Sequence, residues 1–239
     1  MYKQIFLSAL LCFFLQLFAY SDTETDSLYN EAISVFKNTS CVNATIKRYQ
    51  IYKGVTRESS GSFKYDQAKG AVYYYTSPSK FQITCTDSIL YSIDPEKKQG
   101  FRFITAIDDP LRYYDLDPFH RFFPLLTKLS SLSFLGSIDS ISIFCKQNAC
   151  TNKPEISVGI DRVGKKVSLL EFFNKNGYIQ QQVIFTYKKE KLPETIVTKV
   201  MLGDSLLVDS IIVQYKKQNN KLPADVFIIP EGITWSIEK

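Results

Sequence analysis

The sequence is poor in the residues and patterns that mark several common classes of protein. Its 239 residues include only 10 Gly and 9 Pro, and 45% of them are hydrophobic. This composition excludes collagen-like and disordered chains, because such chains have too few apolar side chains to offset the loss of chain entropy on folding. The net charge of +5 is not concentrated in a basic run. Nucleic-acid binding usually needs Lys and Arg gathered on one face, so a solvated surface is the better interpretation.

Catalytic and metal-binding motifs are also scarce. The chain has one histidine, His120, and no pair of CxxC motifs, which disfavours a zinc site. It has no Gly-x-Ser-x-Gly elbow, P-loop or Gly-x-Gly-x-x-Gly motif. The acid pairs Asp108-Asp109 and Asp115-x-Asp117 could serve metal or glycoside chemistry, but acids in a loop are more often solvated. We therefore predict that the protein is not an enzyme and has no cofactor.

The first 21 residues are predicted to be a secretory signal peptide. Lys3 supplies a positive start, Ile5–Leu15 form a short apolar run, and small residues precede the predicted cleavage after Ser21. The apolar stretch is broken by Gln16 and is short for a membrane span of about 20 residues, although an uncleaved anchor is the alternative. We assign residues 22–239 to a single exported domain.

Four cysteines follow the predicted signal peptide: Cys41, Cys85, Cys145 and Cys150. An even number of cysteines in an exported chain suggests two disulfides, and four cysteines allow three pairings. Cys145 and Cys150 enclose four residues that are typical of a turn between two strands. We therefore predict the bridge Cys145–Cys150 together with Cys41–Cys85.

Hydrophobic periodicity predicts one short helix followed by a sheet. Leu28, Ala32, Ile33 and Phe36 recur at helical spacing. Most of the chain that follows consists of runs rich in β-branched and aromatic residues, separated by turn residues. Short connections predict antiparallel neighbours, because parallel strands need long crossovers. The expected strands are Val42–Tyr52, Arg57–Tyr65, Ala71–Thr76, Lys80–Thr84, Ser88–Ile93, Gly100–Thr105, Ser137–Cys145, Glu155–Asp161, Val167–Asn174, Tyr178–Lys188, Glu194–Leu202, Ser205–Gln214 and Val226–Ile229.

The middle of the chain interrupts the strand pattern. A long, acid-rich loop is expected first. The segment Pro118–Leu132 then places Phe122, Leu125 and Leu126 along one side of a helix, in which Pro124 predicts a kink or a restart. No composition break or internal repeat marks a domain boundary. The sequence therefore predicts an α+β fold that is mainly antiparallel β.

Alternation along the first strands predicts an apolar face. Residues two apart point to the same side of a strand, so each alternating set lies on one side of a twisted sheet. This face is either the core, packed by the two helices, or a concave, partly unfilled surface that takes up a greasy ligand. Composition alone does not separate the two. The residues concerned are Tyr73, Tyr75, Phe81, Ile83, Tyr91, Ile93, Phe101 and Phe103.

Three stretches of the sequence resemble the periplasmic lipoprotein-carrier (LolA-type) family. Gly61-x-Phe63-x-Tyr65 is similar to its glycine-led strand. Residues 72–95 are similar to its strand ending in Pro-x-x-Phe, its Asp-containing turn and its closing Asp-Pro. The run FIIPEGIT at residues 227–234 is similar to its ending in Pro-x-Gly and an aliphatic residue. The segment around Pro124 lies about where that family has a lid helix.

Two positions depart from the pattern of the LolA-type family. Ser77 stands where the family often has an arginine that helps to hold the lid. Asp87-Ser88 stands where the family usually has Asp-Gly. The chain is thus expected to be a divergent relative whose lid is held differently.

The resemblance implies a half-open β-barrel, made of a strongly curved sheet of about 11 strands and closed by an N-terminal helix and a mid-chain lid helix. It implies a monomeric periplasmic carrier that shelters the acyl chains of lipoproteins on the way to the outer membrane. The partners that it implies are an inner-membrane export complex and an outer-membrane acceptor. It implies no nucleic-acid partner. The alternative on the same fold is a lipid-sensing regulatory module or a carrier of another lipid. The implied cavity residues are Phe63, Tyr73, Tyr75, Phe81, Ile83, Tyr91, Ile93, Phe101, Phe103, Phe122, Leu125 and Leu126.

Overall fold

A computed structural model describes residues 26–86, 89–104, 122, 125–126, 129, 132–147, 153–216 and 222–237. The predicted signal peptide, His120, Cys150 and the two acid pairs of the mid-chain loop lie outside these described residues.

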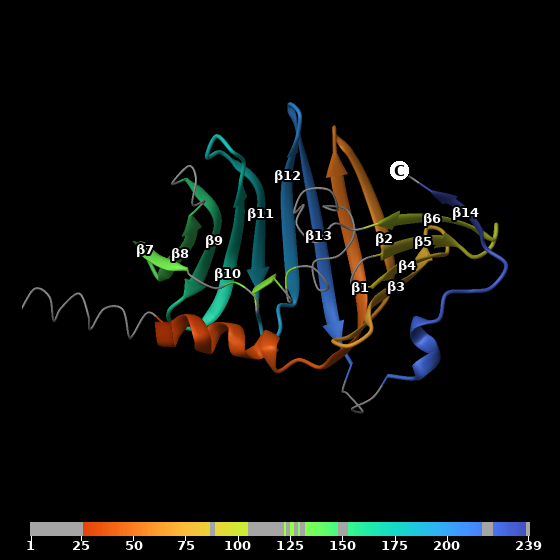
Figure 1. Cartoon of the computed structure of the whole chain (residues 1–239), viewed down its shortest axis with the longest axis horizontal. Helices are drawn as coiled ribbons and strands as arrows, with labels where there is room; N and C mark the ends of the chain where they lie inside the picture. Colours follow the sequence, from red (N-terminus) through yellow and green to blue (C-terminus); the bar gives the residue numbers. More distant parts are fainter. Residues whose placement is uncertain are drawn as a thin grey trace, which may run out of the picture.

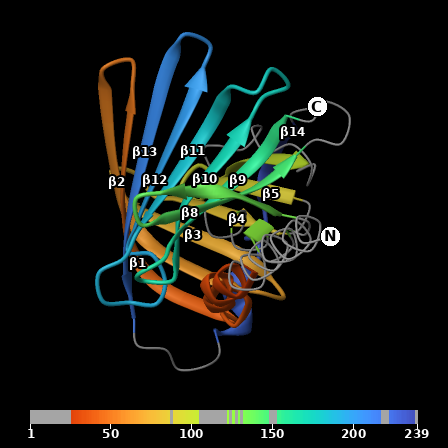
Figure 2. The same ribbon diagram turned by 90° about the vertical axis from the view of Figure 1, so that its left-hand side faces the viewer.

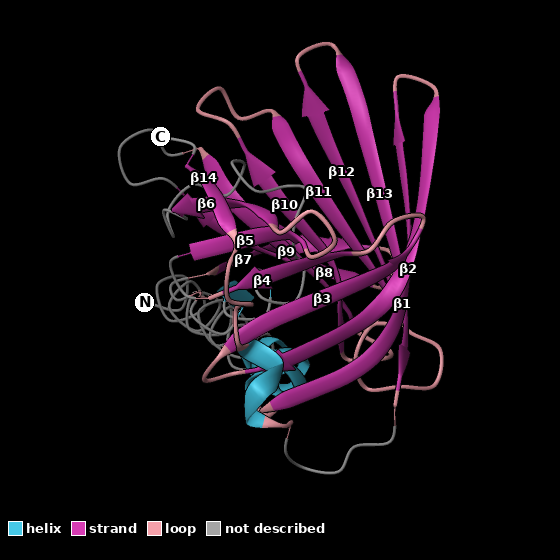
Figure 3. Ribbon diagram, turned by 90° about the vertical axis from the view of Figure 1, so that its right-hand side faces the viewer, coloured by secondary structure: helices cyan, strands magenta, loops and turns pink. Residues whose placement is uncertain are grey.

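The strands form one sheet with the order β14-β6-β5-β4-β3-β2-β1-β13-β12-β11-β10-β9-β8-β7. Neighbouring strands are antiparallel, except that β14 runs parallel to β6. The sheet is strongly curved, and its edges β14 and β7 are not joined (Figures 1 and 3). The strands are β1 (Cys41–Tyr52), β2 (Val55–Asp66), β3 (Gly70–Ser77), β4 (Phe81–Cys85), β5 (Ile89–Asp94), β6 (Gln99–Ile104), β7 (Ser133–Ile138), β8 (Ile141–Gln147), β9 (Pro154–Asp161), β10 (Lys166–Phe173), β11 (Ile179–Thr186), β12 (Thr195–Leu202), β13 (Ser205–Tyr215) and β14 (Thr234–Ile237).

The predicted fold class is confirmed, but the sheet has 14 strands rather than about 11. A turn at Asp139 divides one expected strand into β7 and β8, because Asp139 adopts a left-handed φ of 52°, which Asp tolerates better than most residues. The expected strand Val226–Ile229 is wrong. Ala224–Phe227 instead form the short 3-10 helix η1 after Pro223, and β14 follows it at the sheet edge.

Residues 26–37 form the N-terminal helix, which lies at the end of the sheet opposite the tall hairpins (Figure 2). Its apolar residues Ala32, Ile33 and Phe36 are buried in the main core, as the helical spacing predicts. The ring of Tyr29 lies 5.4 Å from that of Phe144 on β8. In the described part of the chain, no helix is long and apolar enough to cross a bilayer.

Cys41, Cys85 and Cys145 are buried thiols, and no disulfide is formed among the described cysteines. The predicted Cys41–Cys85 bridge is wrong, because β2 and β3 lie between the strands that carry the two residues. Neighbouring strands are about 4.8 Å apart, so the two residues lie about 14 Å apart across the sheet, beyond the reach of a disulfide. The Cys145–Cys150 bridge is not seen either: the Cys145 thiol donates a hydrogen bond to the carbonyl oxygen of Lys146 at 3.6 Å, and Cys150 is outside the described residues.

Candidate functional site

The inner face of the sheet, which carries the main core, is the candidate site. On β2, β3 and β4, Phe63, Tyr73 and Ile83 lie directly opposite one another in the register. The rings of Phe63 and Tyr73 are 4.7 Å apart, and those of Tyr75 and Phe81 stack at 4.3 Å. The structure therefore brings these five predicted residues together on one apolar surface. Phe81 is only partly buried, whereas the other four are buried.

Tyr91 and Ile93 do not share this surface, so their predicted place on it is wrong. The register sets Tyr91 opposite Thr84 and Ile93 opposite Gln82, on the outer face of the sheet. Leu90 takes the inner position instead and is buried in the main core. The physical reason is the turn between β4 and β5: alternation fixes which residues of one strand share a face, but the turn fixes the phase of the next strand.

Phe101 and Phe103 extend the inner face across β6. They lie opposite Ser92 and Leu90, respectively, and their rings are 6.4 Å apart. Phe103 packs against the main core, whereas Phe101 is 50% exposed. The inner face therefore ends in an open aromatic margin at this side of the sheet.

The second half of the sheet supplies an opposing apolar wall that the sequence reasoning did not assign to the site. The mid-chain residues Phe122 and Leu126 are buried, and Leu125 is half-buried beside them. The ring of Phe122 lies 6.1 Å from that of Phe172 and 6.4 Å from that of Phe185. Alternation in β8–β13 could have predicted this wall. Its buried residues are Phe144, Val158, Leu170, Phe172, Val183, Phe185, Ile196, Ile211 and Val213.

A hydrogen bond joins the N-terminal helix to the mid-chain segment. The Tyr29 hydroxyl donates to the carbonyl oxygen of Leu126 at 3.2 Å. Burial raises the pKa of Tyr29 to about 12, so this hydroxyl keeps its proton at neutral pH. Both segments that were expected to close the barrel are thus attached to each other as well as to the inner face.

A buried ion pair interrupts the apolar inner face between β1 and β13. The Arg48 guanidinium donates to Asp209 through Nε at 2.9 Å and through Nη2 at 2.6 Å. Its Nη1 donates to the Tyr75 hydroxyl at 3.2 Å. Arg48 is 5% exposed and Asp209 is 4% exposed. This bidentate ion pair offsets the loss of hydration of the two charges. An isolated buried charge would have no such compensation.

Two further polar side chains lie on the inner face, one beside the ion pair and one a strand further along the sheet. Thr198 on β12 is directly opposite Asp209, and Gln181 on β11 is opposite Val200. Gln181 is 1% exposed, and its Oε1 atom has no hydrogen-bond partner among the residues that the structure describes. A buried acceptor of this kind costs about 1–3 kcal/mol unless a donor reaches it. The inner face is therefore apolar with one polar band across β11, β12, β13 and β1.

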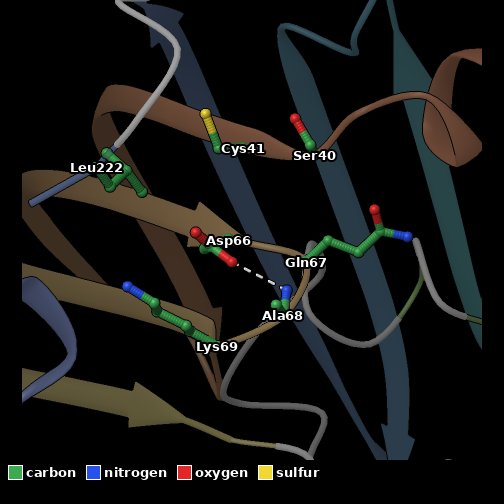
Figure 4. A pocket seen from close by; sticks show the side chains of 7 residues that line it. All are labelled: Ser40, Cys41, Asp66, Gln67, Ala68, Lys69 and Leu222. Carbon is green, nitrogen blue, oxygen red and sulfur yellow. Dashed lines mark hydrogen bonds between the residues drawn. The ribbon is translucent and has the colours of Figure 1, made fainter. Parts of the chain in front are cut away.

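A surface pocket of about 570 Å³ lies near the beginning of β1 (Figure 4). The polar groups that line this pocket make contacts within the protein. The Asp66 carboxylate accepts the backbone N–H of Ala68 at 2.9 Å, and the Lys69 amine lies 5.7 Å from the ring of Phe227. Burial and the Asp66 charge raise the pKa of the Cys41 thiol, which makes it a poor nucleophile. Its lining residues are Ser40, Cys41, Asp66, Gln67, Ala68, Lys69 and Leu222.

A metal site receives no support from the part of the chain described. No group of three or more His, Cys, Asp and Glu side chains there could hold a metal ion. The candidate catalytic residues Asp108, Asp109 and His120 lie outside the described residues. Among the described residues, the inner face is the candidate surface for binding a ligand.

Comparisons with known proteins identify the fold. No family model and no curated protein matches the sequence. A LolA superfamily protein from Nitrosomonas europaea is 13% identical, with a TM-score of 0.59 over 85% of this chain and 97% of that one. A DUF1329 family protein from Desulfovibrio piger is 9% identical, with a TM-score of 0.59 over 85% of this chain and 96% of that one. A Vibrio parahaemolyticus domain assigned to outer membrane lipoprotein sorting is 11% identical, with a TM-score of 0.54 over 83% of this chain and 94% of that one.

These likenesses show that the chain has a LolA-like fold with a strongly divergent sequence. The resemblance seen in the three sequence stretches is therefore confirmed at the level of the fold. The identities of 9–13% do not extend that conclusion to the ligand.

Proposed function

We propose that the protein is a periplasmic carrier that shelters the acyl chains of lipoproteins, or of a related lipid, against the inner face of its sheet. The observation that supports it most is the extent of this face, which runs from β6 to β8 across a sheet whose edges are not joined. Because each buried CH₂ group contributes about 0.8 kcal/mol, an acyl chain gains affinity here without any directional chemistry. Two of the solved neighbours, the LolA superfamily protein and the lipoprotein-sorting domain, support the same class of function.

The polar band gives the proposed cargo a second requirement. A bare hydrocarbon would leave the Gln181 Oε1 atom without a donor, whereas an amide N–H or a hydroxyl next to the acyl chain could satisfy it. An N-acylated peptide carries such an N–H group. An amphiphile of this kind therefore suits the inner face better than an alkane or a wax.

Native mass spectrometry on protein purified without detergent tests the proposal. We expect bound lipid, or uptake of a synthetic triacylated lipopeptide, in a complex of one protein chain. The variant Phe101→Asp places a charge at the open margin of the inner face and should weaken uptake. The variant Ile228→Asp is a matched control, because Ile228 is 62% exposed in the C-terminal segment, away from the inner face.

Two outcomes would contradict the proposal. In the first, the wild-type protein takes up neither lipid nor lipopeptide. In the second, Phe101→Asp and Ile228→Asp bind the lipopeptide as the wild type does. Recovery of a stable protein partner with no lipid would favour the regulatory module on the same fold.

A further inference from the structure

Three long hairpins end at the same side of the molecule, opposite the N-terminal helix (Figures 1 and 3). They are formed by β1 and β2, by β12 and β13, and by β10 and β11. The first two are adjacent because β1 is hydrogen-bonded to β13. Their turns contain Lys53-Gly54 and Gly203-Asp204, and both glycines have positive φ angles of 76° and 59°. The two glycines allow tight turns at the ends of the long strands. The hairpin tips therefore lie away from the main core.

Four large apolar side chains at the two adjacent tips are exposed, and we call them the tip patch: Ile51, Val55, Met201 and Leu206. Their exposed fractions are 45%, 58%, 45% and 47%. Apolar side chains scattered singly on a surface are ordinary, but a contiguous group marks an interaction site.

The register shows that most of the tip patch is contiguous. Ile51 lies opposite Val208, and Met201 lies opposite Leu206. Val208 and Leu206 are two residues apart on β13, so they share the outer face of the sheet with their partners. Val55 lies opposite Tyr52 at the turn of the first hairpin, so it is exposed at the same tip but on the other face of the sheet.

The third hairpin also carries exposed apolar and aromatic side chains at its turn. Tyr178 is 72% exposed and Ile179 is 46% exposed at the turn between β10 and β11. The ring of Tyr178 is an amphipathic group of the kind found at membrane interfaces. All three hairpins thus present apolar or aromatic side chains at one end of the molecule.

The charge at this end is complementary to an anionic surface. The three tip segments, residues 50–58, 174–180 and 199–207, contain four basic residues and two acidic ones. Lys199 lies directly opposite Val208, beside the tip patch on the outer face. The Lys53 amine lies 5.3 Å from the ring of Tyr52, at the turn itself. Basic residues beside exposed apolar side chains are the combination that binds membranes containing anionic lipid.

We propose that the tip patch docks the protein on the surface of a membrane that contains anionic phospholipid. The apolar side chains enter the interfacial layer, while Lys53 and Lys199 meet the headgroup charge. A protein partner is disfavoured because a specific interface covers about 800 Å² on each side, and narrow hairpin tips fit a deformable layer better than a firm surface. Docking at this end would bring the inner face close to the lipid. The docking proposal thus extends the proposed function, but it does not depend on the identity of the cargo.

Vesicle flotation tests the docking directly. Wild-type protein is mixed with vesicles of phosphatidylglycerol and phosphatidylethanolamine, and separately with vesicles of phosphatidylcholine alone. We expect flotation with the anionic vesicles, weaker binding as salt is added, and little binding to phosphatidylcholine. The double variant Met201→Ser with Leu206→Ser should weaken vesicle binding about ten-fold or more, since it removes apolar surface from the interface.

Two further variants separate the causes. Val163→Ser is the matched control, because Val163 is 86% exposed in the turn between β9 and β10, at the other end of those strands. It should bind vesicles as the wild type does. Lys53→Gln with Lys199→Gln should reduce binding to anionic vesicles and weaken its salt dependence.

The docking proposal is overturned if the wild type does not float with anionic vesicles, or if Met201→Ser with Leu206→Ser and Val163→Ser bind them equally well. Lipopeptide uptake by the tip variants, measured by native mass spectrometry, keeps the two proposals separate. Normal uptake with lost flotation supports docking and the carrier together. Flotation of a wild type that takes up no lipid would leave docking intact and remove the carrier.

Discussion

The outer face of the sheet over β3–β6 and the same face over β1, β13 and β12 are built in opposite ways. Over β3–β6, Val72, Thr84 and Ile93 are completely buried, although they point away from the main core. The C-terminal segment, residues 222–237, lies beside these strands (Figure 1). The Tyr74 hydroxyl donates to the carbonyl oxygen of Val226 at 2.7 Å. The ring of Trp235 lies 5.4 Å from that of Tyr91.

Over β1, β13 and β12, by contrast, polarity is partly inverted. The inner face carries the Arg48–Asp209 pair and Thr198, which are polar and buried. The outer face carries Ile51 and Leu206, which are apolar and exposed. Natural proteins break the rule of apolar inside and polar outside mainly where function requires it. The comparison indicates that the outer face over β3–β6 serves stability, whereas the outer face over β1, β13 and β12 carries the surface proposed for docking.

The ion pair should give the largest effect on stability. Asp209→Ala leaves the Arg48 charge buried without its partner and should lower the free energy of unfolding by about 3–5 kcal/mol. The double variant Arg48→Met with Asp209→Leu removes both charges and should recover most of that loss. Urea denaturation measures both. Equal destabilisation by the single and double variants would show that packing, rather than charge, dominates at this point of the inner face.

Two isoleucines on the outer face make the comparison sharper. Ile93→Ala creates a cavity beside the C-terminal segment and should cost about 2–5 kcal/mol. Ile51→Ala removes an exposed side chain at a hairpin tip and should change stability by no more than about 0.5 kcal/mol. Thermal and urea unfolding of the two variants provide the measurement. Similar losses for both would mean that the hairpin tips are part of the core, and the contrast between the two regions would be lost.

Alkaline pH should act through the contact between the helix and the mid-chain segment. Burial raises the pKa of Tyr29 to about 12, above the value of about 10 expected in the unfolded chain. Its contribution to stability is therefore complete below about pH 10 and is lost as pH rises toward 12. Tyr29→Phe removes the hydrogen bond to Leu126 and should cost about 0.5–1.5 kcal/mol at neutral pH.

The readout is the slope of stability against pH above about pH 10, where Tyr29→Phe should give a shallower decline than the wild type. Tyr178→Phe is the matched control, because Tyr178 is 72% exposed and should leave the slope unchanged. An unchanged slope in Tyr29→Phe would assign the alkaline loss to other tyrosines whose pKa is raised. Burial also raises the pKa of Tyr187 and Tyr215.

Much of the fold and part of the candidate site could be predicted from the sequence. Most strands were readable because alternation and turn residues are local properties of the chain, although β14 was not predicted. Phe63, Tyr73, Tyr75, Phe81 and Ile83 were correctly placed on one face for the same reason. The short motifs shared with the LolA-type family then indicated the architecture. The Asp139 turn and η1 were missed, because their signals are weak beside the apolar runs that flank them.

The sequence by itself thus determined which residues of a strand share a face, where most turns fall, and that the strands would be mainly antiparallel. The curvature of the sheet was implied by the motifs shared with the LolA-type family. Tertiary structure alone decided how successive strands are phased, which moved Tyr91 and Ile93 to the outer face. It also separated Cys41 from Cys85 by two strands and joined Arg48 to Asp209, which are 161 residues apart in the chain. The physical reason is that strand order and register arise from packing over the whole sheet, and no local pattern encodes them.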